Sequence, residues 1–394
     1  MKEGWTYKKL GEVCEKSKNI RWEDIEEDKS FSYIDLTSVD RETLSIKGPQ
    51  LITKANAPSR AKQIVKEGDI LFATTRPTLK RVCLIPPSFD NQICSTGFCV
   101  LRPKADVDSK WIYFLLQDEK FYHYIEPLQT GASYPAVTDT IVKEYPIHYP
   151  PLSEQQSIVD YLDSVFAKID GMKANAEKAL NEAKALFQAS LKEMLEPKEG
   201  WEEKMFGKIC DFVRGPFGGS LKKECFKDSG YAVYEQQNAI YNKFCFRYYI
   251  DEEKYRSLIR FKINAGDLIM SCSGTIGKVA IIPEDCKEGI INQALLKLTP
   301  KKEIDAHFLK YLMESKYFEE IINANIEGVA IKNIASVAVL KAIKLYIPKI
   351  SEQLKIVLEI DSLKSKVDRL QENFDKISQE CDALKQAILR QVFE

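Results

Sequence analysis

Histidine is scarce in this sequence, and its ten cysteines are scattered. The three histidines, His123, His148 and His307, are far apart in the chain. No two cysteines form the Cys-x-x-Cys pair that many protein zinc sites use. We therefore expect no metal site, and cysteines that remain free in a reducing cytosol.

Long apolar runs are also missing. No stretch reaches the length of about 18 apolar residues that marks a candidate transmembrane helix. The first residues, Met1-Lys2-Glu3-Gly4-Trp5, lack the apolar segment of a signal peptide. We expect a cytoplasmic protein that does not associate with a membrane.

The chain has almost no net charge. Its 57 Lys and Arg residues are balanced by 58 Asp and Glu residues, which gives a formal charge of −1. A strongly basic field, the usual electrostatic mark of an isolated DNA-binding protein, is absent. Any contact with nucleic acid must therefore depend on local basic patches or on partner proteins.

Catalytic signatures are missing as well. The segment 274–279 is too short for a P-loop and lacks its hydroxyl residue. Tyr149-Pro150-Pro151-Leu152 has no Asn or Asp before its prolines, as an adenine methyltransferase motif would. The Glu-x-Lys triplets at 202–204 and 252–254 are expected by chance where 29% of residues are charged. We expect a chain without a catalytic site or cofactor of its own.

An internal repeat organises the whole chain. The segment 150–156, Pro-Pro-Leu-Ser-Glu-Gln-Gln, returns at 348–354 as Pro-Lys-Ile-Ser-Glu-Gln-Leu. Glu154 and Gln155 thus correspond to Glu352 and Gln353, 198 residues later. Each copy precedes a long helical pattern, so the chain reads as a tandem duplication. We predict two domains and two long helices, at 1–149, 150–197, 198–347 and 348–394.

Each predicted helix carries a heptad of apolar residues, the 4-3 spacing that is typical of a coiled-coil seam. The first seam comprises Ile158, Leu162, Val165, Ile169, Met172, Ala176, Ala179, Ala183 and Leu186. The second comprises Ile356, Ile360, Leu363, Val367, Leu370, Phe374, Ile377, Cys381, Leu384 and Ile388. We expect the helices to form an antiparallel coiled coil; parallel or intermolecular pairing is the alternative.

The two globular parts repeat one order of elements. Alternating apolar and aromatic residues predict strands at 31–36 and 231–236. A Gly-Asp turn before an apolar run predicts a buried strand at the end of 65–72 and of 263–270. Each part then has further strands and one amphipathic helix: strands 82–85, 93–101 and 145–149 with helix 109–125, and strands 279–282, 290–298 and 342–347 with helix 306–322. The fold class is therefore α+β, with two tandem domains.

Basic and hydroxyl residues gather in the turn-rich segments of both halves. The candidates are Thr75, Arg76, Lys80 and Arg81 in the first half, and Arg214, Lys222, Lys223, Ser273 and Lys278 in the second. Such loops suit phosphate because their backbone N–H groups are free, although a solvated hairpin tip would look the same. Gln236 and Asn238 follow a predicted strand, and their amides could pair with adenine edges in the major groove or form a polar strand face.

The repeated features together resemble the specificity subunits of type I restriction-modification systems. The resemblance rests on the Ser-Glu-Gln segments, the long helices, Gly-Asp-Ile-Leu-Phe at 68–72, Gly-Asp-Leu-Ile-Met at 266–270, Ser-Gly-Thr-Ile-Gly-Lys at 273–278, and the starts Gly4-Trp5 and Gly200-Trp201. The first half departs from this pattern, because 75–80 reads Thr-Arg-Pro-Thr-Leu-Lys. The two loops therefore need not share one geometry.

This resemblance implies that each domain recognises one half of a bipartite site in double-stranded DNA. It implies an antiparallel coiled coil with pseudo-twofold symmetry between the helices. It also implies two methyltransferase subunits and motor-nuclease subunits as partners, which would bind S-adenosylmethionine, ATP and magnesium in place of this chain. Two other classes stay open: a specificity subunit of a type IIB-like system that cuts on both sides of its site, and a coiled-coil scaffold that binds no DNA.

Overall fold

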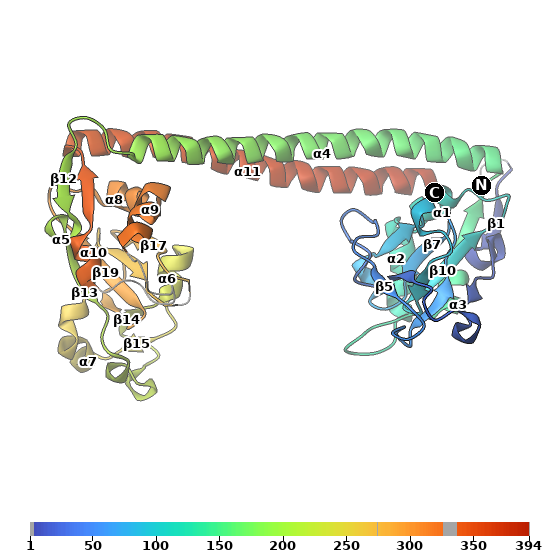
Figure 1. The fold of residues 1–394 in the computed structure, drawn as a ribbon, viewed down its shortest axis with the longest axis horizontal. Coiled ribbons are helices and arrows are strands. Elements are labelled where there is room, and N and C mark those ends of the chain that lie inside the picture. The colour runs from blue at the N-terminus through green and yellow to red at the C-terminus, as the bar shows by residue number, and fades with distance from the viewer. Residues whose placement is uncertain (1–3, 274, 326–336, 394) are drawn as a thin grey trace. The chain divides into compact units, whose positions relative to one another are not determined.

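The structure is a computed structural model that describes residues 4–273, 275–325 and 337–393 (Figure 1). The chain divides into two units, and each unit contains one domain and parts of both long helices. Unit 1 comprises Met1–Glu177 and Phe374–Glu394, and unit 2 comprises Lys178–Asn373. No helix in the described ranges has the length and apolarity required to cross a membrane.

Domain 1, the globular part of unit 1, combines small sheets with short helices. Its strands are β1 (Thr6–Lys9), β2 (Cys14–Glu15), β3 (Lys18–Asn19), β4 (Phe31–Ile34), β5 (Gln50–Ile52), β6 (Ala61–Ile64), β7 (Ile70–Ala73), β8 (Val82–Leu84), β9 (Ile93–Ser95), β10 (Phe98–Pro103) and β11 (Pro146–Tyr149). Its helices are α1 (Ser109–Leu115), α2 (Glu119–Ile125) and α3 (Asp139–Lys143). The strand orders are β1-β11, β2-β10-β7-β8 and β3-β6-β9-β4-β5, in which only β4 and β9 pair in parallel among the described strands.

Domain 2, the globular part of unit 2, repeats this topology. Its strands are β12 (Glu202–Met205), β13 (Cys210–Arg214), β14 (Tyr231–Tyr234), β15 (Tyr249–Ile250), β16 (Leu268–Ser271), β17 (Val279–Ile281), β18 (Gly289–Ile291), β19 (Leu295–Pro300) and β20 (Lys344–Ile347). Its helices are α5 (Phe206–Ile209), α6 (Gln236–Tyr241), α7 (Glu252–Ser257), α8 (Ala306–Glu314), α9 (Lys316–Asn325) and α10 (Val337–Ala342). The orders β12-β20 and β13-β19-β16-β17 match those of domain 1, and β15-β14-β18 corresponds to its β5-β4-β9, again with one parallel pair, β14 and β18. The predicted tandem α+β domains are confirmed.

The two domains differ in one part of this shared topology. In domain 1, β3 and β6 extend the sheet that contains β4 and β9. Domain 2 has α7 between β15 and β16, where domain 1 has β6 between β5 and β7. Figure 1 shows α7, β14 and β15 at the end of domain 2 that lies away from the long helices. The duplicated halves have therefore diverged mainly in the sheet that includes β4 or β14.

The repeated Gly-Asp turns lead directly into the buried strands β7 and β16. Gly68 and Gly266 have φ values of +79° and +80°, which glycine adopts without the strain of a Cβ atom. The next residue, Asp69 or Asp267, accepts a hydrogen bond of 2.8 Å from the backbone N–H three residues earlier. Every residue of β7 and of β16 is buried. The predicted turns and strands are confirmed.

Two predicted strands are each divided in the structure. The predicted strand at 93–101 is β9 followed by β10, and that at 290–298 is β18 followed by β19. The two members of each pair belong to different sheets. The single-strand predictions were wrong because an apolar run does not show where a chain leaves one sheet and enters another.

Two predicted helices are also divided. The predicted helix at 109–125 is α1 followed by α2, and that at 306–322 is α8 followed by α9. Asp118 caps the start of α2 by accepting a hydrogen bond from the backbone N–H of Lys120. The Ser315 hydroxyl accepts one from the N–H of Phe318 at the second break. A capping residue thus starts a new helix at each break, although the spacing of apolar residues in the sequence continues across it.

The two long helices are α4 (Leu152–Leu195) and α11 (Ile350–Phe393). Within unit 1, Asp170 accepts a hydrogen bond from Lys385 at 2.5 Å, and Lys173 bonds to Asp382 at 3.4 Å. Residue numbers rise along α4 while those of the partners fall along α11. The predicted antiparallel pairing is therefore confirmed within this unit.

The buried face of α4 is only partly the predicted one. Leu162 and Ile169 are 0% and 3% exposed, as the heptad predicts. Met172 and Leu186, however, are 61% and 66% exposed. At these positions and at Ala179 the next residue is the more buried one: Lys173, Leu180 and Phe187 take these seam places. The prediction was wrong there because α4 has side chains that can be buried at two adjacent positions of the heptad, and the second of these positions faces inward.

The second seam is closer to the prediction. Ile360, Cys381 and Ile388 are buried, and Leu363, Val367, Phe374 and Ile377 are half-buried. Leu370 and Leu384 are exposed, with 38% and 49% of their surface accessible. At these two positions, as on α4, the heptad predicted a buried side chain that is exposed in the structure.

Candidate nucleic-acid interface

In domain 2 the predicted contact residues Arg214, Gln236 and Ser273 lie at or just after the ends of three strands, β13, β14 and β16. Backbone hydrogen bonds tie the ends of these strands to the segment 292–295. Gly215 N donates to Leu295 O (3.0 Å), Cys272 N donates to Ala294 O (2.9 Å), and Asn292 N donates to Tyr234 O (2.9 Å). The loops that carry the three predicted residues therefore gather at one edge of domain 2.

A basic, glycine-rich loop begins at this edge. Arg214 is exposed, and its charge partly offsets the burial that raises the pKa of Cys272 to about 11. Phe217 is 92% exposed, which is unusual for a large apolar side chain. Lys222 and Lys223 are also exposed, and no salt bridge within the described part of the chain neutralises either of them. This loop presents positive charge and an aromatic ring to solvent.

The two predicted amide residues have different surroundings. Gln236 is half-buried at the first position of α6. Asn238 is 1% exposed, and its Oδ1 accepts a hydrogen bond from Glu235 N at 2.7 Å. Its Nδ2 donates to Lys243 O at 2.7 Å and to Cys245 O at 3.3 Å. The Asn238 amide thus closes its own loop, and Gln236 is the amide that stands nearer the surface.

Ser273 and Lys278 lie in the tight β16–β17 turn, and both are exposed. Ser271 holds this turn: its carbonyl accepts from Gly277 N at 2.9 Å, and its hydroxyl accepts from Lys278 N at 3.0 Å. Gly274, also part of the motif, lies outside the described residues.

Domain 1 places Thr75, Arg76, Lys80 and Arg81 in the equivalent β7–β8 turn. The turn contains a short 3-10 helix, Pro77–Leu79, flanked by Arg76 and Lys80 with φ values of +50° and +56°. Left-handed φ is uncommon for residues other than glycine and is often found at functional sites. The two hairpin turns therefore differ in geometry, as the departure from the motif indicated.

The charges in this turn are not equally available. Lys80 forms an ion pair with Glu119 and lies over the ring of Tyr122, 5.1 Å from its centroid. Arg76 is exposed, and its guanidinium lies 4.7 Å from the centroid of the Tyr134 ring. Tyr134 is itself 69% exposed. Lys80 is therefore neutralised within domain 1, whereas Arg76 is presented to solvent on an aromatic ring.

Two residues beside this turn were missed by the sequence analysis, Arg41 and Tyr134. Burial, and then the charges of Arg41 and Arg76, lower the pKa of Arg81, so both cations act on the Arg81 guanidinium. Tyr134 precedes Pro135 in a Gly-Ala-Ser-Tyr-Pro segment, and that turn signal could have drawn attention to it. Nothing in the local sequence distinguishes Arg41 from other loop arginines.

The repeated glutamine at the start of each long helix has a structural role: its hydrogen bonds join that helix to its own domain. Gln155 is fully buried; its Oε1 accepts from Asp108 N at 2.9 Å, and its Nε2 donates to Pro150 O at 2.9 Å. Asp108 in turn caps the start of α1 through Lys110 N and Trp111 N. The side chain therefore joins the start of α4 to the start of α1 in its own domain.

Gln353 makes the same connections in unit 2. It is also fully buried, and it accepts from Asp305 N and donates to Pro348 O, each at 2.9 Å. Asp305 caps α8. Of the neighbouring glutamates, Glu154 is half-buried, and Glu352 is exposed and accepts a hydrogen bond of 3.0 Å from the Trp201 indole.

The other predicted helix residues fall into two groups. Leu162 and Ile169 belong to the buried core of unit 1, with Ile158 packed against it. Ile356 belongs to the core of unit 2. The initial parts of both helices thus pack on their own domains, whereas Leu363, Leu370 and Phe374 lie farther along α11, half-buried or exposed.

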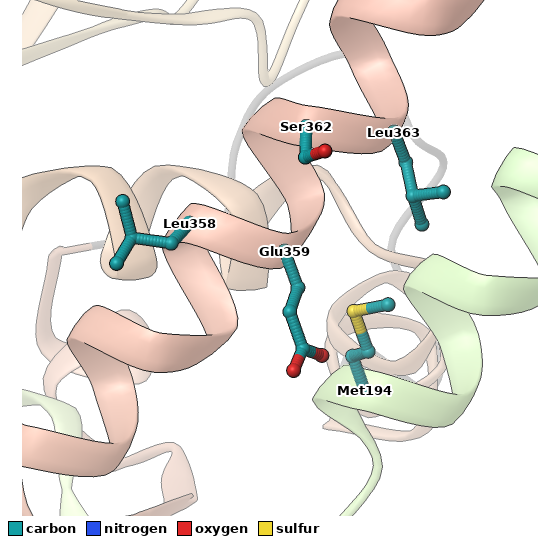
Figure 2. A pocket seen from close by; sticks show the side chains of 5 residues that line it. All are labelled: Met194, Leu358, Glu359, Ser362 and Leu363. Atoms are coloured by element: carbon teal, nitrogen blue, oxygen red, sulfur yellow. The ribbon is translucent and has the colours of Figure 1, made fainter.

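A shallow apolar pocket of about 400 Å³ lies between the last turn of α4 and α11 within unit 2. Figure 2 shows Met194 on one helix facing Leu363 on the other, with Glu359 beside Met194. Ser362 and Leu358 complete the lining, and Leu358 is 70% exposed. Across residues 4–273, 275–325 and 337–393 no cluster of three or more His, Cys, Asp or Glu side chains could hold a metal ion.

The sequence matches a known protein family in two places. The sequence profile described as "Type I restriction modification DNA specificity domain" matches residues 2–182 and again residues 198–378. The chain belongs to this family. The two matches start 196 residues apart, which is also the offset between Gly4-Trp5 and Gly200-Trp201 at the domain starts.

Curated relatives in this family are similar to parts of the chain. The "Type I restriction enzyme HindI specificity subunit" of Haemophilus influenzae is 28% identical over 137 residues, 34% of this chain and 29% of that protein. The "Type I restriction enzyme EcoBI specificity subunit" of Escherichia coli is 23% identical over 316 residues, 69% of this chain and 64% of that protein. The matches thus span less than two thirds of the length of each relative.

Solved structures of the family are similar along the whole chain. The HsdS subunit from Thermoanaerobacter tengcongensis has a TM-score of 0.61 and 25% identity, covering 100% of this chain and 97% of that one. A chain solved in work on complex assembly and conformational transition of the type I R-M system has a TM-score of 0.83 and 26% identity. That match covers 100% of this chain and 98% of the other.

Proposed function

We propose that the chain is the non-catalytic specificity subunit of a type I restriction-modification enzyme. Each domain would read one half of a bipartite site in double-stranded DNA. The observation that carries this proposal is the double match to the specificity-domain family at the period of the duplicated domains. The relatives' names favour a type I system over a type IIB-like system or a scaffold.

The reading surface in each domain would be the loop cluster at the ends of the buried strands. Domain 1 offers Thr75 there, and domain 2 offers Arg214, Gln236 and Ser273. Arginine pairs with guanine and glutamine with adenine in the major groove, because their donors and acceptors match those base edges. Different side chains on equivalent loops would give the two half-sites different sequences.

Partner subunits would dock on the long helices. Exposed apolar side chains occur on both, namely Tyr161, Met172 and Leu186 on α4, and Ile350, Leu354 and Leu358 on α11. Exposed apolar residues on a helix are suited to burial against another protein. We infer that two methyltransferase subunits and motor-nuclease subunits assemble with this chain, and that they bring S-adenosylmethionine, ATP and magnesium.

Genome-wide adenine methylation tests this function. The chain is expressed with its cognate type I methyltransferase, and single-molecule sequencing compares these cells with cells that express the methyltransferase alone. The expected result is a new methylated motif of two half-sites with a fixed gap. An assembled complex that yields no such motif would contradict the proposal.

The variant Gln236→Ala assigns one half-site to domain 2. Loss of a bidentate base contact costs roughly 1–3 kcal/mol of discrimination, so one position of one half-site should be relaxed while the other half-site stays unchanged. The control is Gln156→Ala, which removes an exposed glutamine on α4. Unaltered methylation in the Gln236 variant would exclude this side chain from base reading.

A further inference from the structure

Arg41, Arg76 and Arg81 lie on two loops of domain 1 whose neighbouring residues share one apolar cluster. Arg81 immediately precedes β8, and Arg76 lies at the other end of the same turn. Arg41 lies in a loop closed by a bridge between Val39 and Ile46. Val39 and Ile46 pack with Cys83 of β8 in one apolar cluster, so the loop that carries Arg41 is anchored beside the strand that follows Arg81.

The Arg76 side chain is held in place before any ligand binds. Its backbone is left-handed, with φ of +50°, and its N–H donates to Pro135 O at 2.7 Å. Its guanidinium contacts Ser133 O at 3.5 Å and lies over the Tyr134 ring. An arginine fixed in this way loses little side-chain entropy when it contacts an anion.

Among the described residues, no acid forms a salt bridge with these arginines. Asp40 forms a salt bridge with Lys47 at 3.3 Å and accepts hydrogen bonds from Thr43. Glu119 is paired with Lys80. The Nε atom of Arg81 is buried and has no hydrogen-bond partner among the described residues. A buried donor without an acceptor is unfavourable, and burial together with the charges of Arg41 and Arg76 lowers the pKa of Arg81.

An anion placed beside these groups would offset the repulsion among them. We propose that Arg41, Arg76 and Arg81 form a clamp for a backbone phosphate of the DNA that domain 1 binds. Phosphate oxygens accept bidentate hydrogen bonds from guanidinium groups. The equivalent turn of domain 2 carries Ser273 and Lys278 but no arginine. The clamp would thus hold the DNA backbone at domain 1 and carry no sequence information itself. This inference rests on the proposed function.

The test is the salt dependence of DNA binding by the chain assembled with its methyltransferase. The double variant Arg41→Gln/Arg81→Gln is compared with the parent on a target duplex and on a scrambled duplex. Loss of one phosphate contact should reduce the slope of log K against log salt by about 0.9, so a fourfold rise in salt weakens the variant about 3.5-fold less than the parent. The affinity for both duplexes should fall by the same factor, and the methylated motif should not change.

Two matched variants accompany this measurement. Arg41→Lys/Arg81→Lys keeps both charges and should retain the parental slope. Arg256→Gln removes an arginine that is already paired with Glu252 on α7, and it should also leave the slope unchanged. Thermal unfolding of the double variant checks that domain 1 is still folded; Arg41→Gln alone, on an exposed loop, replaces it if it is not.

The outcomes separate the clamp from the function on which it rests. A parental slope in the glutamine variants overturns the clamp, as does a loss confined to the target duplex, which would make the arginines base readers. Failure of the variants to assemble with the methyltransferase would show that the arginines bind protein instead. A parent complex that binds neither duplex would contradict the proposed function itself.

Discussion

At the scale of single residues, glutamine and asparagine side chains show how burial changes a role. Gln155 and Gln353 belong to the segment that is repeated in the sequence. Both are fully buried, and their side chains join a long helix to its domain. Their amides each supply one acceptor and at least one donor to backbone groups. Asn238, predicted as a base-reading residue, uses its amide in the same structural way. Gln236, two residues earlier, is nearer the surface.

Replacing Gln155 should loosen the junction between α4 and α1. Gln155→Ala leaves the N–H of Asp108 and the carbonyl of Pro150 without this partner, at roughly 1–3 kcal/mol for each buried group left unsatisfied. We expect faster hydrogen exchange at the Asp108 amide and a lower melting temperature. Gln156→Ala, at the exposed neighbouring position, is the control.

Gln155→Glu refines this test, since a carboxylate can accept from Asp108 N but cannot donate to Pro150 O. It should restore protection of the Asp108 amide only in part. Exchange equal to the parent in Gln155→Ala would refute this structural role.

At the scale of elements, the long helices show what a heptad does and does not specify. Period and length were predicted from apolar spacing alone, and α4 and α11 are each 44 residues long. The choice of buried face was partly wrong, because two adjacent frames of α4 both contain large apolar residues. Phe166, outside the predicted seam, is 7% exposed and contacts Phe114 of α1 at a centroid distance of 5.5 Å.

The corrected face of α4 predicts unequal effects for two residues of unit 1. Phe166→Ala should destabilise the protein by roughly 3–5 kcal/mol, because a buried aromatic ring leaves a cavity. Met172→Ala should change stability by no more than about 0.5 kcal/mol, because Met172 is exposed. Urea unfolding followed by circular dichroism measures both. A larger loss of stability for Met172→Ala than for Phe166→Ala would support the buried face that was predicted from the heptad.

At the scale of the whole molecule, unit 1 is assembled from the two ends of the chain. Its core includes Leu389 and Ile388 from the last turns of α11. The Gln386 amide donates to Gln117 O at 3.0 Å, and its oxygen accepts from Glu119 N at 3.2 Å, where α1 gives way to α2. Domain 1 therefore depends on residues that lie more than 260 positions later in the sequence.

Removal of residues 374–394 should consequently destabilise domain 1 and spare domain 2. The deletion exposes the part of the unit 1 core that α11 covers, whereas the core of domain 2 receives no residue from that segment. Hydrogen exchange should accelerate in α1 and α2 and remain slow in β16 and β19. Gln386→Ala, compared with exposed Gln379→Ala, tests the capping contact without the deletion. Equal loss of protection in both domains would contradict this assignment.

The duplication, the α+β class of both domains, the long helices and their antiparallel pairing all followed from the sequence. Each depends on local or periodic patterns: the 198-residue repeat, the Gly-Asp turns and the heptads. The candidate site was predictable only in part. Arg76 stood out as a basic residue in a turn-rich segment, and Gln236 as an amide at a predicted strand, whereas Arg41 joined the site through the apolar cluster that Val39 and Ile46 share with Cys83 of β8.

The remaining features depend on contacts between residues far apart in the chain. The frame of α4 that faces inward is set by the shape of the surfaces that it packs against. The division of 93–101 between two sheets depends on which strands are available as partners. The burial of Asn238 depends on the loop folded around it. A pattern in the sequence defines a period and an order of elements, whereas accessibility and partners exist only after the distant parts of the chain have packed together.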